Sequence, residues 1–200
     1  MIKLLCIVIG YFIGCVQSAY IVGKIWHVDI RKHGSGNLGT TNALRVLGKR
    51  AGLITFVCYI LKAVVAFVLC YHIFDKNYVL GVYACLGVVL GHDFPFYLGF
   101  KGGKGIAATI GMALCMVATI SPVYLLSAIT GIGGVLIKGY VSMGSLGFIC
   151  MLPVLSLVIK TSTEVIVITA FMAALAIYQH RANIKRIING NENTLFKKKS

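Results

Sequence analysis

The sequence predicts an all-α, polytopic integral membrane protein with about seven transmembrane helices, and three observations lead to that fold class. Hydrophobic residues make up 58% of the 200-residue chain and charged residues only 12%, and the mean hydropathy is +0.91. A soluble domain of this length could not bury so much apolar surface in one core. The apolar residues also gather into long runs, and the basic residues, 19 against 5 acidic ones, lie mostly between those runs.

Three of these runs are long enough to cross a bilayer, which takes about 20 apolar residues. They are Ile2–Gly23, Ala51–Ile73 and Tyr78–Leu98. We interpret the first as an uncleaved span rather than a signal peptide, because further spans follow it. Four shorter runs complete the count of seven: Ile106–Ile120, Val123–Ile137, Leu146–Ile159 and Glu164–Tyr178. Their shortness leaves a count of five or six open.

Turn signals separate the shorter runs. Ser121-Pro122 stands between two of them and the polar stretch Lys160–Thr163 between two others. We expect residues 1–200 to form a single membrane domain, with residues 181–200 as a basic cytoplasmic tail.

Charge placement predicts the orientation of the chain. With seven spans and the N-terminus outside, the C-terminus lies in the cytoplasm. Most basic residues then fall in inside segments, as the positive-inside bias requires. They are Lys24, Arg31, Lys32, Arg45, Lys49, Arg50, Lys101, Lys104, Lys138, Arg181, Lys185, Arg186 and Lys197–Lys199. The glycine-rich and polar motifs lie in the same segments, so we expect the protein to work at its cytoplasmic face.

The first such motif is "HGSGNLGTTNALR", His33–Arg45. Its glycines allow positive φ and a backbone concavity of N–H groups that binds anions. Thr40, Thr41 or Asn42 is expected to cap a short helix that ends at Gly48. The Ser35 hydroxyl and the Arg45 guanidinium suit a phosphate. The alternative is an ordinary glycine-rich turn in which Arg45 only sets the topology.

The G-x-G-x-x-G spacing within this motif is also that of a dinucleotide-binding turn. That turn requires a preceding strand and a βαβ unit. Here the flanking segments are membrane spans, so the sequence argues against dinucleotide binding.

The second motif is "GHDFPFYLGFKGGKG", Gly91–Gly105. Lys101, Gly102, Gly103 and Lys104 make a cationic loop suited to phosphate, although the spacing is not that of a Walker A motif. The aromatic residues around Pro95 are typical of an interfacial anchor. His92 beside Asp93 is more simply explained as hydrogen-bonded scaffold.

Two further motifs lie near the C-terminal end. In "KGYVSMGS", Lys138–Ser145, either serine could cap the following helix, or Ser142 could donate to a substrate. In "HRANIKRIINGNE", His180–Glu192, the side chains of His180, Asn183 and Arg186 recur every third residue and form one polar helix face. The alternative there is a basic amphipathic helix on the membrane surface.

Together the four motifs resemble the bacterial acyl-phosphate:glycerol-3-phosphate acyltransferase family. The family pattern G-S-G-N-x-G-x-T-N-x-x-R is similar to Gly34–Arg45, and G-H-x-F-P…F-K-G-G-K-G is similar to Gly91–Gly105. The basic-Y-V-S element and the H-R-x-N-I-x-R…G-x-E tail are similar to Lys138–Ser142 and His180–Glu192. Thr40, where the family more often has alanine, and Gly139, an insertion, depart from the pattern.

The resemblance implies transfer of a fatty acyl group from acyl phosphate to the 1-hydroxyl of glycerol 3-phosphate, giving lysophosphatidic acid and phosphate. The implied location is the bacterial cell membrane, with the active site on the cytoplasmic face. We expect His180, Asn183 and Ser142 to be catalytic. Substrate-binding residues are expected to be Ser35, Asn37, Thr41, Arg45, Lys101, Gly102, Gly103 and Lys104. No cofactor, metal or nucleic acid is expected, and a transient acyl-phosphate-producing partner enzyme is left open.

Two rival functions fit the sequence less well. An acyl-CoA or acyl-carrier-protein acyltransferase would use H-x₄-D, but no histidine of this chain has aspartate at that spacing. A transporter for a phosphorylated solute would place ionisable groups at mid-depth. The spans carry few, chiefly Lys62 and His72, so the enzyme is the favoured interpretation.

Overall fold

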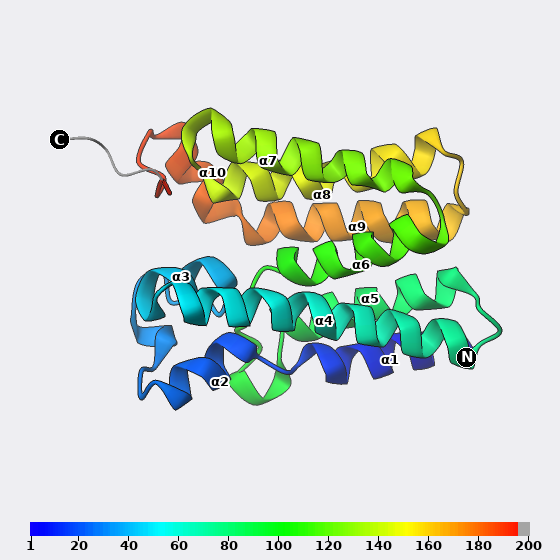
Figure 1. The fold of residues 1–200 in the computed structure, drawn as a ribbon, viewed down its shortest axis with the longest axis horizontal. Helices are drawn as coiled ribbons and strands as arrows, with labels where there is room; N and C mark the ends of the chain where they lie inside the picture. The colour runs from blue at the N-terminus through cyan, green and yellow to red at the C-terminus, as the bar shows by residue number, and fades with distance from the viewer. Residues whose placement is uncertain (196–200) are drawn as a thin grey trace. The chain divides into compact units, whose positions relative to one another are not determined.

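Helices are the only regular secondary structure within Met1–Leu195, the residues that the computed structural model describes. These residues divide into two compact units, Met1–Thr119 and the residues from Ile120 onward. Each unit is built from helices that run side by side (Figure 1). The all-α prediction is therefore confirmed.

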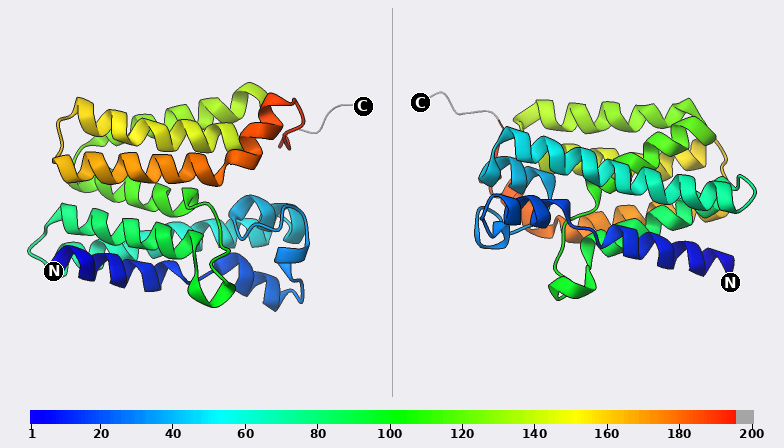
Figure 2. Two further views of the ribbon diagram at one scale, coloured as in Figure 1. Left: turned by 180° about the vertical axis from the view of Figure 1, so that it is seen from behind. Right: turned by 60° about the horizontal axis from the view of Figure 1, so that its bottom comes forward.

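Unit 1 contains the first three predicted spans, the fourth up to Thr119, and the two glycine-rich loops. Helix α4 contacts α1, α5 and α6, and α1 packs along α5. The elements are α1 (Ile2–Gly14), α2 (Ser18–Ile25), η1 (Ile30–Lys32), α3 (Thr40–Leu47), α4 (Lys49–Ile73), α5 (Tyr78–Asp93), η2 (Phe96–Leu98) and α6 (Ile106–Thr119). The connection that carries η2 projects from the helices of this unit in both views of Figure 2.

Glycines bring α1 and α5 into backbone contact. A Cβ at Gly10 would collide with the carbonyl of Ala84, and a Cβ at Gly87 would collide with the carbonyl of Ile7. Small residues permit this close approach, and close packing is a main source of stability between helices in lipid. The pair α1/α5 therefore depends on glycine in both partners.

The first span is broken at Cys15–Gln17, which the uninterrupted apolar run did not predict. Side chains from distant helices hydrogen-bond the carbonyl groups exposed at the break. The Tyr97 hydroxyl donates to the Cys15 carbonyl at 2.8 Å. The Lys62 ammonium donates to the carbonyls of Gly14 at 2.6 Å and Val16 at 3.0 Å. Non-helical backbone at membrane depth requires such internal partners.

Unit 2 contains the last three predicted spans. Its elements are η3 (Pro122–Leu125), α7 (Leu126–Lys138), α8 (Val141–Val158), α9 (Thr163–Gln179) and α10 (Arg181–Ile188). Helix α8 contacts both α7 and α9. It begins five residues before the predicted Leu146, because Gly139 (φ 71°) ends α7 in the left-handed region and the chain re-enters a helix after Tyr140. Helix α10 bends away from α9 by 59°, and Lys197–Lys199 of the predicted tail lie outside the described residues.

The lengths of the helices fit fewer spans than seven. Four helical segments of the described chain are long and apolar enough to cross a membrane: Ile2–Ile25, Lys49–Ile73, Tyr78–Leu98 and Val141–Val158. The bent pair α9/α10 makes a fifth if it is counted as one span. Helix α6 has 14 residues, or about 21 Å at 1.5 Å per residue. Length and composition therefore support an integral membrane protein with four or five clear spans.

Candidate functional site

Asn42 ties the first glycine-rich loop to the rest of unit 1. Its side-chain oxygen accepts from the Ser35 N–H at 2.9 Å, and its amide donates to the carbonyls of Ile30 at 3.3 Å and His33 at 3.1 Å. Asn42 is 2% exposed. It therefore holds the loop from inside, while Arg45, one turn further along α3, is exposed.

The N-cap of α3 is Gly39, with no side-chain cap, so the predicted cap by Thr40, Thr41 or Asn42 is wrong. The Asn42 side chain is committed to the preceding loop and cannot serve the helix end. Gly48 (φ 88°) ends the helix as predicted. The predicted positive φ is found at Gly34 (61°) and Gly36 (69°), but not at Gly39, which is extended with φ −98°.

Part of the predicted anion-binding concavity is already occupied by protein contacts. The N–H of Ser35 donates to Asn42, that of Gly36 to the His33 carbonyl at 3.0 Å, and that of Leu38 to the Gly102 carbonyl at 3.5 Å. The backbone of the Gly34–Gly39 loop is thus shaped by internal hydrogen bonds. A phosphate would meet a preformed loop rather than a row of unpaired N–H groups.

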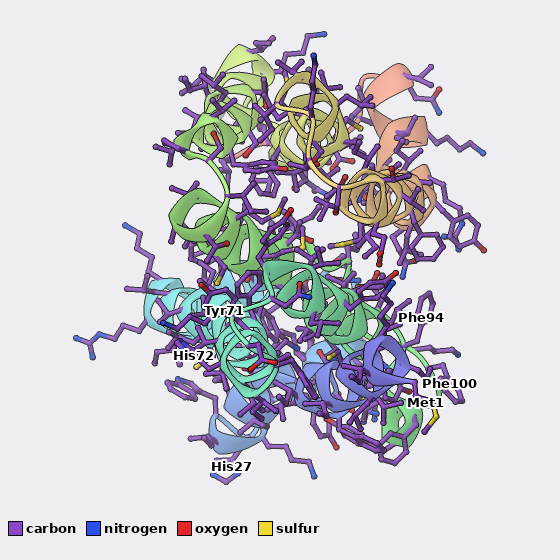
Figure 3. All side chains as sticks on the ribbon, turned by 90° about the vertical axis from the view of Figure 1, so that its right-hand side faces the viewer. Met1, His27, Tyr71, His72, Phe94 and Phe100 are labelled. Carbon is purple, nitrogen blue, oxygen red and sulfur yellow. The ribbon has the colours of Figure 1, made fainter. Side chains whose placement is uncertain are left out.

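The second glycine-rich loop folds back on the end of α5. Gly102 N–H donates to the Asp93 carbonyl and Gly103 N–H to the His92 carbonyl, both at 3.0 Å. The side chain of His92 is 2% exposed, as the scaffold interpretation predicted. Phe100 lies at the periphery of the unit (Figure 3) and is 60% exposed, which fits the predicted interfacial anchor.

The two loops meet at the carbonyl of Gly102. It accepts from the Asn37 side-chain amide at 3.3 Å and from the Leu38 N–H at 3.5 Å. Leu38 itself is buried beside Tyr59, whose hydroxyl donates to the Leu38 carbonyl at 2.7 Å. Motifs about 65 residues apart in the chain therefore share one anchored junction. Around it Ser35, Arg45 and Lys101 are exposed and Thr41 and Lys104 are half-buried.

In unit 2 the polar residues converge on Glu192. Its carboxylate accepts from Asn183 Nδ2 at 2.7 Å, Ser142 Oγ at 3.0 Å and Arg186 Nε at 2.7 Å. The Glu192 side chain is only 4% exposed. The N-cap residue of α8 is Tyr140, with no side-chain cap, so the alternative that Ser142 or Ser145 caps this helix is wrong. The Ser142 hydroxyl is used by Glu192 instead.

The pKa of the Glu192 carboxyl reflects these contacts. Burial alone would raise it, but the hydrogen bonds from Asn183, Arg186 and Ser142 outweigh burial and lower the pKa below its ordinary value of 4.5. Glu192 is therefore ionised at neutral pH. It fixes the Asn183 amide with its nitrogen toward the carboxylate.

His180 stands at the junction of α9 and α10 and is 4% exposed. Its Nδ1 lies 2.8 Å from the Ala176 carbonyl. Because a carbonyl only accepts, Nδ1 carries the proton, and in the neutral ring Nε2 is the acceptor nitrogen. This tautomer allows Nε2 to accept a hydrogen bond from a hydroxyl.

Sequence reasoning missed the roles of three residues that organise these clusters: Asn42, Lys62 and Glu192. Asn42 and Glu192 lie within motifs and Lys62 lies outside them. Lys62 and Glu192 have partners far along the chain, 48 residues away at Gly14 and 50 at Ser142, whereas the partners of Asn42 are 7 to 12 residues away. Lys62, an ionisable residue within a predicted span, was the one visible signal.

These features define a helical integral membrane protein that carries two joined, cationic, glycine-rich loops in one unit and a carboxylate-centred polar cluster in the other. A family model described as "Glycerol-3-phosphate acyltransferase" matches residues 4–190. The chain belongs to this family, and it is therefore an acyltransferase.

Curated relatives support the assignment over the full length of the chain. The glycerol-3-phosphate acyltransferase of Endomicrobium trichonymphae is 42% identical over 202 residues and covers 100% of both chains. That of Thermoanaerobacter pseudethanolicus is 38% identical over 204 residues and covers 99% of this chain and 98% of its own.

Solved structures show the same fold. The glycerol 3-phosphate form of PlsY, an integral membrane glycerol 3-phosphate acyltransferase, superposes with a TM-score of 0.88 at 32% identity and covers 97% of this chain and 96% of its own. Its lysophosphatidic acid form gives a TM-score of 0.85 at 31% identity, over 97% and 95% of the two chains.

Proposed function

We propose that this protein transfers a fatty acyl group from acyl phosphate to the 1-hydroxyl of glycerol 3-phosphate, the first step of phospholipid synthesis. The observation that carries the proposal is the junction of the two cationic, glycine-rich loops at the Gly102 carbonyl. Both substrates carry phosphate, and the two motifs that meet at this junction carry cationic side chains, Arg45, Lys101 and Lys104, of the kind that bind it. The relatives in glycerol 3-phosphate and lysophosphatidic acid forms support the acceptor and the product.

The phosphate of glycerol 3-phosphate is assigned to Arg45 and Lys104, with Ser35 as a further donor. Ser142 is not assigned to this phosphate, because its hydroxyl already donates to Glu192. Asn37 and Thr41, with the Gly34–Gly39 loop, are assigned to the head of the acyl phosphate, and Lys101, Gly102 and Gly103 complete the second loop. Arginine binds phosphate in a bidentate manner and lysine as a point charge. The alternative is the reverse assignment, in which each loop binds the phosphate of the other substrate. A ligand-bound structure would distinguish the two assignments.

The reaction needs no covalent enzyme intermediate. Acyl phosphate is a mixed anhydride, so the acceptor oxygen can attack its carbonyl carbon directly. The new C–O ester bond forms, the bond from that carbon to the phosphate oxygen breaks, and phosphate leaves. Orientation of the substrates and stabilisation of developing charge supply the rate.

His180 and Asn183 are assigned to orient the acceptor hydroxyl. The hydroxyl proton goes either to His180 Nε2 or to the departing phosphate. Replacement His180→Ala distinguishes the two routes. Loss of about 10³-fold in kcat with near-normal KM assigns the base to His180. A small loss assigns the proton to the departing phosphate.

The orientation proposed for this chemistry has the N-terminus outside, seven spans and the active site on the cytoplasmic face. The concentration of basic residues in the inside segments supports it. The acyl chain would then enter sideways from the bilayer.

The deciding experiment supplies the purified protein in detergent with acyl phosphate and glycerol 3-phosphate. Phosphate release that requires both substrates, and that is lost in Arg45→Ala and Lys104→Ala, is the expected result. The exposed Lys76 at the α4–α5 turn provides the control Lys76→Ala, which should keep wild-type activity. No release, together with uptake of a phosphorylated solute into vesicles, would instead establish a transporter.

A further inference from the structure

We propose that Lys62, in the middle of α4, is a positioning residue for the Gly102–Lys104 loop and acts on it through His92. The inference rests on the proposed function, because it takes that loop as the glycerol 3-phosphate loop. Nothing in the motifs of the sequence assigns a role to Lys62.

The Lys62 ammonium has three N–H donors, and the structure supplies three acceptors for them. Two are the carbonyls of Gly14 and Val16 at the break in the first span, at 2.6 and 3.0 Å. The third is His92 Nδ1, at 3.1 Å. The ammonium also lies over the Tyr59 ring, 4.8 Å from its centroid, which favours a cation. Lys62 is 8% exposed, so these partners replace its hydration.

This arrangement selects the tautomer of His92. When Lys62 carries its proton, the ammonium can only donate, so Nδ1 accepts and the ring proton resides on Nε2. The Tyr59 ring meets the imidazole edge-on, with centroids 4.4 Å apart. The His92 ring is therefore held in its orientation by contacts with Lys62 and Tyr59.

The Nε2 edge of this fixed ring lies against Gly103. A Cβ at Gly103 would collide with Nε2 itself. The backbone of His92 holds the same residue, because its carbonyl accepts from the Gly103 N–H at 3.0 Å and from Gln17 Nε2 at 2.9 Å. The His92 ring therefore connects Lys62 to the loop: it contacts Lys62 on one edge and Gly103 on the other. Loss of the ammonium would release the ring that defines one wall of the loop.

A packing role alone does not require a charge at this position. An apolar side chain of similar length would fill the same space without the cost of burying an ammonium in a membrane protein. The lysine head group instead makes three directional hydrogen bonds. They connect the break in the first span to the His92 ring, which packs against the substrate loop.

The test compares three variants in the two-substrate phosphate-release assay. Lys62→Met keeps the length and removes the donors, and Lys62→Arg keeps donors. His92→Asn places an oxygen near the former Nδ1, so that Lys62 retains an acceptor, but the shorter side chain does not reach Gly103. Lys76→Met makes the same chemical change at an exposed lysine of the α4–α5 turn and is the matched control.

Lys62→Met and His92→Asn are expected to lower kcat/KM about 10- to 100-fold, chiefly through a higher KM for glycerol 3-phosphate at little-changed kcat. Lys62→Arg should recover part of this loss, and Lys76→Met should match the wild type. Titration calorimetry with glycerol 3-phosphate should show the same order of affinities.

A wild-type KM in His92→Asn overturns the proposal, and so does a wild-type KM in a folded Lys62→Met protein. If Lys62→Met fails to fold, His92→Asn decides alone. Failure of the proposed function is a different result: the wild-type protein itself then shows no phosphate release that depends on both substrates.

Discussion

Glu192 shows how one residue can organise a cluster whose other members carry the chemistry. Ser142, Asn183 and Arg186 come from two helices, and all three donate to its carboxylate. The sequence motifs drew attention to the donors, because polar side chains at helical spacing suggest a face. The acceptor that orders them lies in the segment after α10, and only the folded chain brings it to Ser142, 50 residues away.

We predict that Glu192→Ala lowers the stability of the detergent-solubilised protein by about 2 kcal/mol, because charge-assisted hydrogen bonds are worth about 1.5–3 kcal/mol each and Arg186 is partly solvated. Thermal unfolding measures the effect. The neighbouring, exposed Asn191 supplies the control Asn191→Ala, and an equal Tm for the two variants would contradict the assigned role.

The lowered pKa of Glu192 predicts a pH dependence with a definite sign. A carboxyl group whose pKa is lower in the folded state stabilises the fold above its unfolded pKa and loses that contribution as the pH falls through the folded value. The stabilisation should therefore be complete near neutral pH and decline below about pH 4.5. Thermal unfolding from pH 7 to pH 3.5 should show the wild type approaching Glu192→Gln. A constant difference between the two proteins would refute the linkage.

At the scale of elements, the contact between α1 and α5 depends on glycine, whereas Gly133 of α7 has open space beside it. We predict that Gly10→Ala separates the helices and destabilises the protein by about 1–3 kcal/mol. At Gly133 in α7, an added Cβ would meet no atom within 4 Å. Gly133→Ala should therefore be neutral or stabilising, and comparison of the two Tm values in detergent tests the contrast.

Most helices could be predicted because a bilayer imposes long apolar runs. The break at Cys15–Gln17 could not, since the run around it is apolar on both sides. It exists because Lys62 and Tyr97 supply donors from other segments. The predicted N-cap of α3 was wrong for a similar reason, because the Asn42 side chain has better partners in the loop before it. A local sequence pattern does not show which of several possible hydrogen-bond partners a group will have in the folded chain.

At the scale of the whole molecule, the number of spans depends on whether α6 and α7 cross the membrane. With seven spans, the turn at Pro122 lies outside the cell. If α6 and α7 instead form a re-entrant pair, the turn lies within the membrane or on its cytoplasmic side. Every other connection then lies on the same side of the membrane as in the seven-span arrangement. This one position therefore distinguishes seven spans from five.

We predict that Pro122→Cys, in a variant with Cys58 replaced by serine, reacts with a membrane-impermeant maleimide added to intact cells. Pro122 is exposed at the start of η3, so the fold does not hide it. Labelling only after the cells are opened would contradict the seven-span arrangement. The same variant without Pro122→Cys measures the background.

The residue types of the site could be predicted from the sequence, but most of the contacts that hold those residues in place could not. Glycines, lysines and Arg45 indicated phosphate binding because few other functions need that combination at a membrane face. The Gly102 junction and the Lys62–His92 contact were not predictable, since each joins segments that only the fold brings together.

The broken first span also bears on how the protein enters the membrane. When this segment leaves the translocon, the acceptors at its break have no donors, because Lys62 and Tyr97 have yet to be inserted. Lys62 in turn can leave the aqueous channel at low cost only when those carbonyls are there to receive it. The first three spans are therefore expected to remain together at the translocon exit and partition into lipid as a group. Biogenesis, and not only catalysis, would then depend on this one lysine.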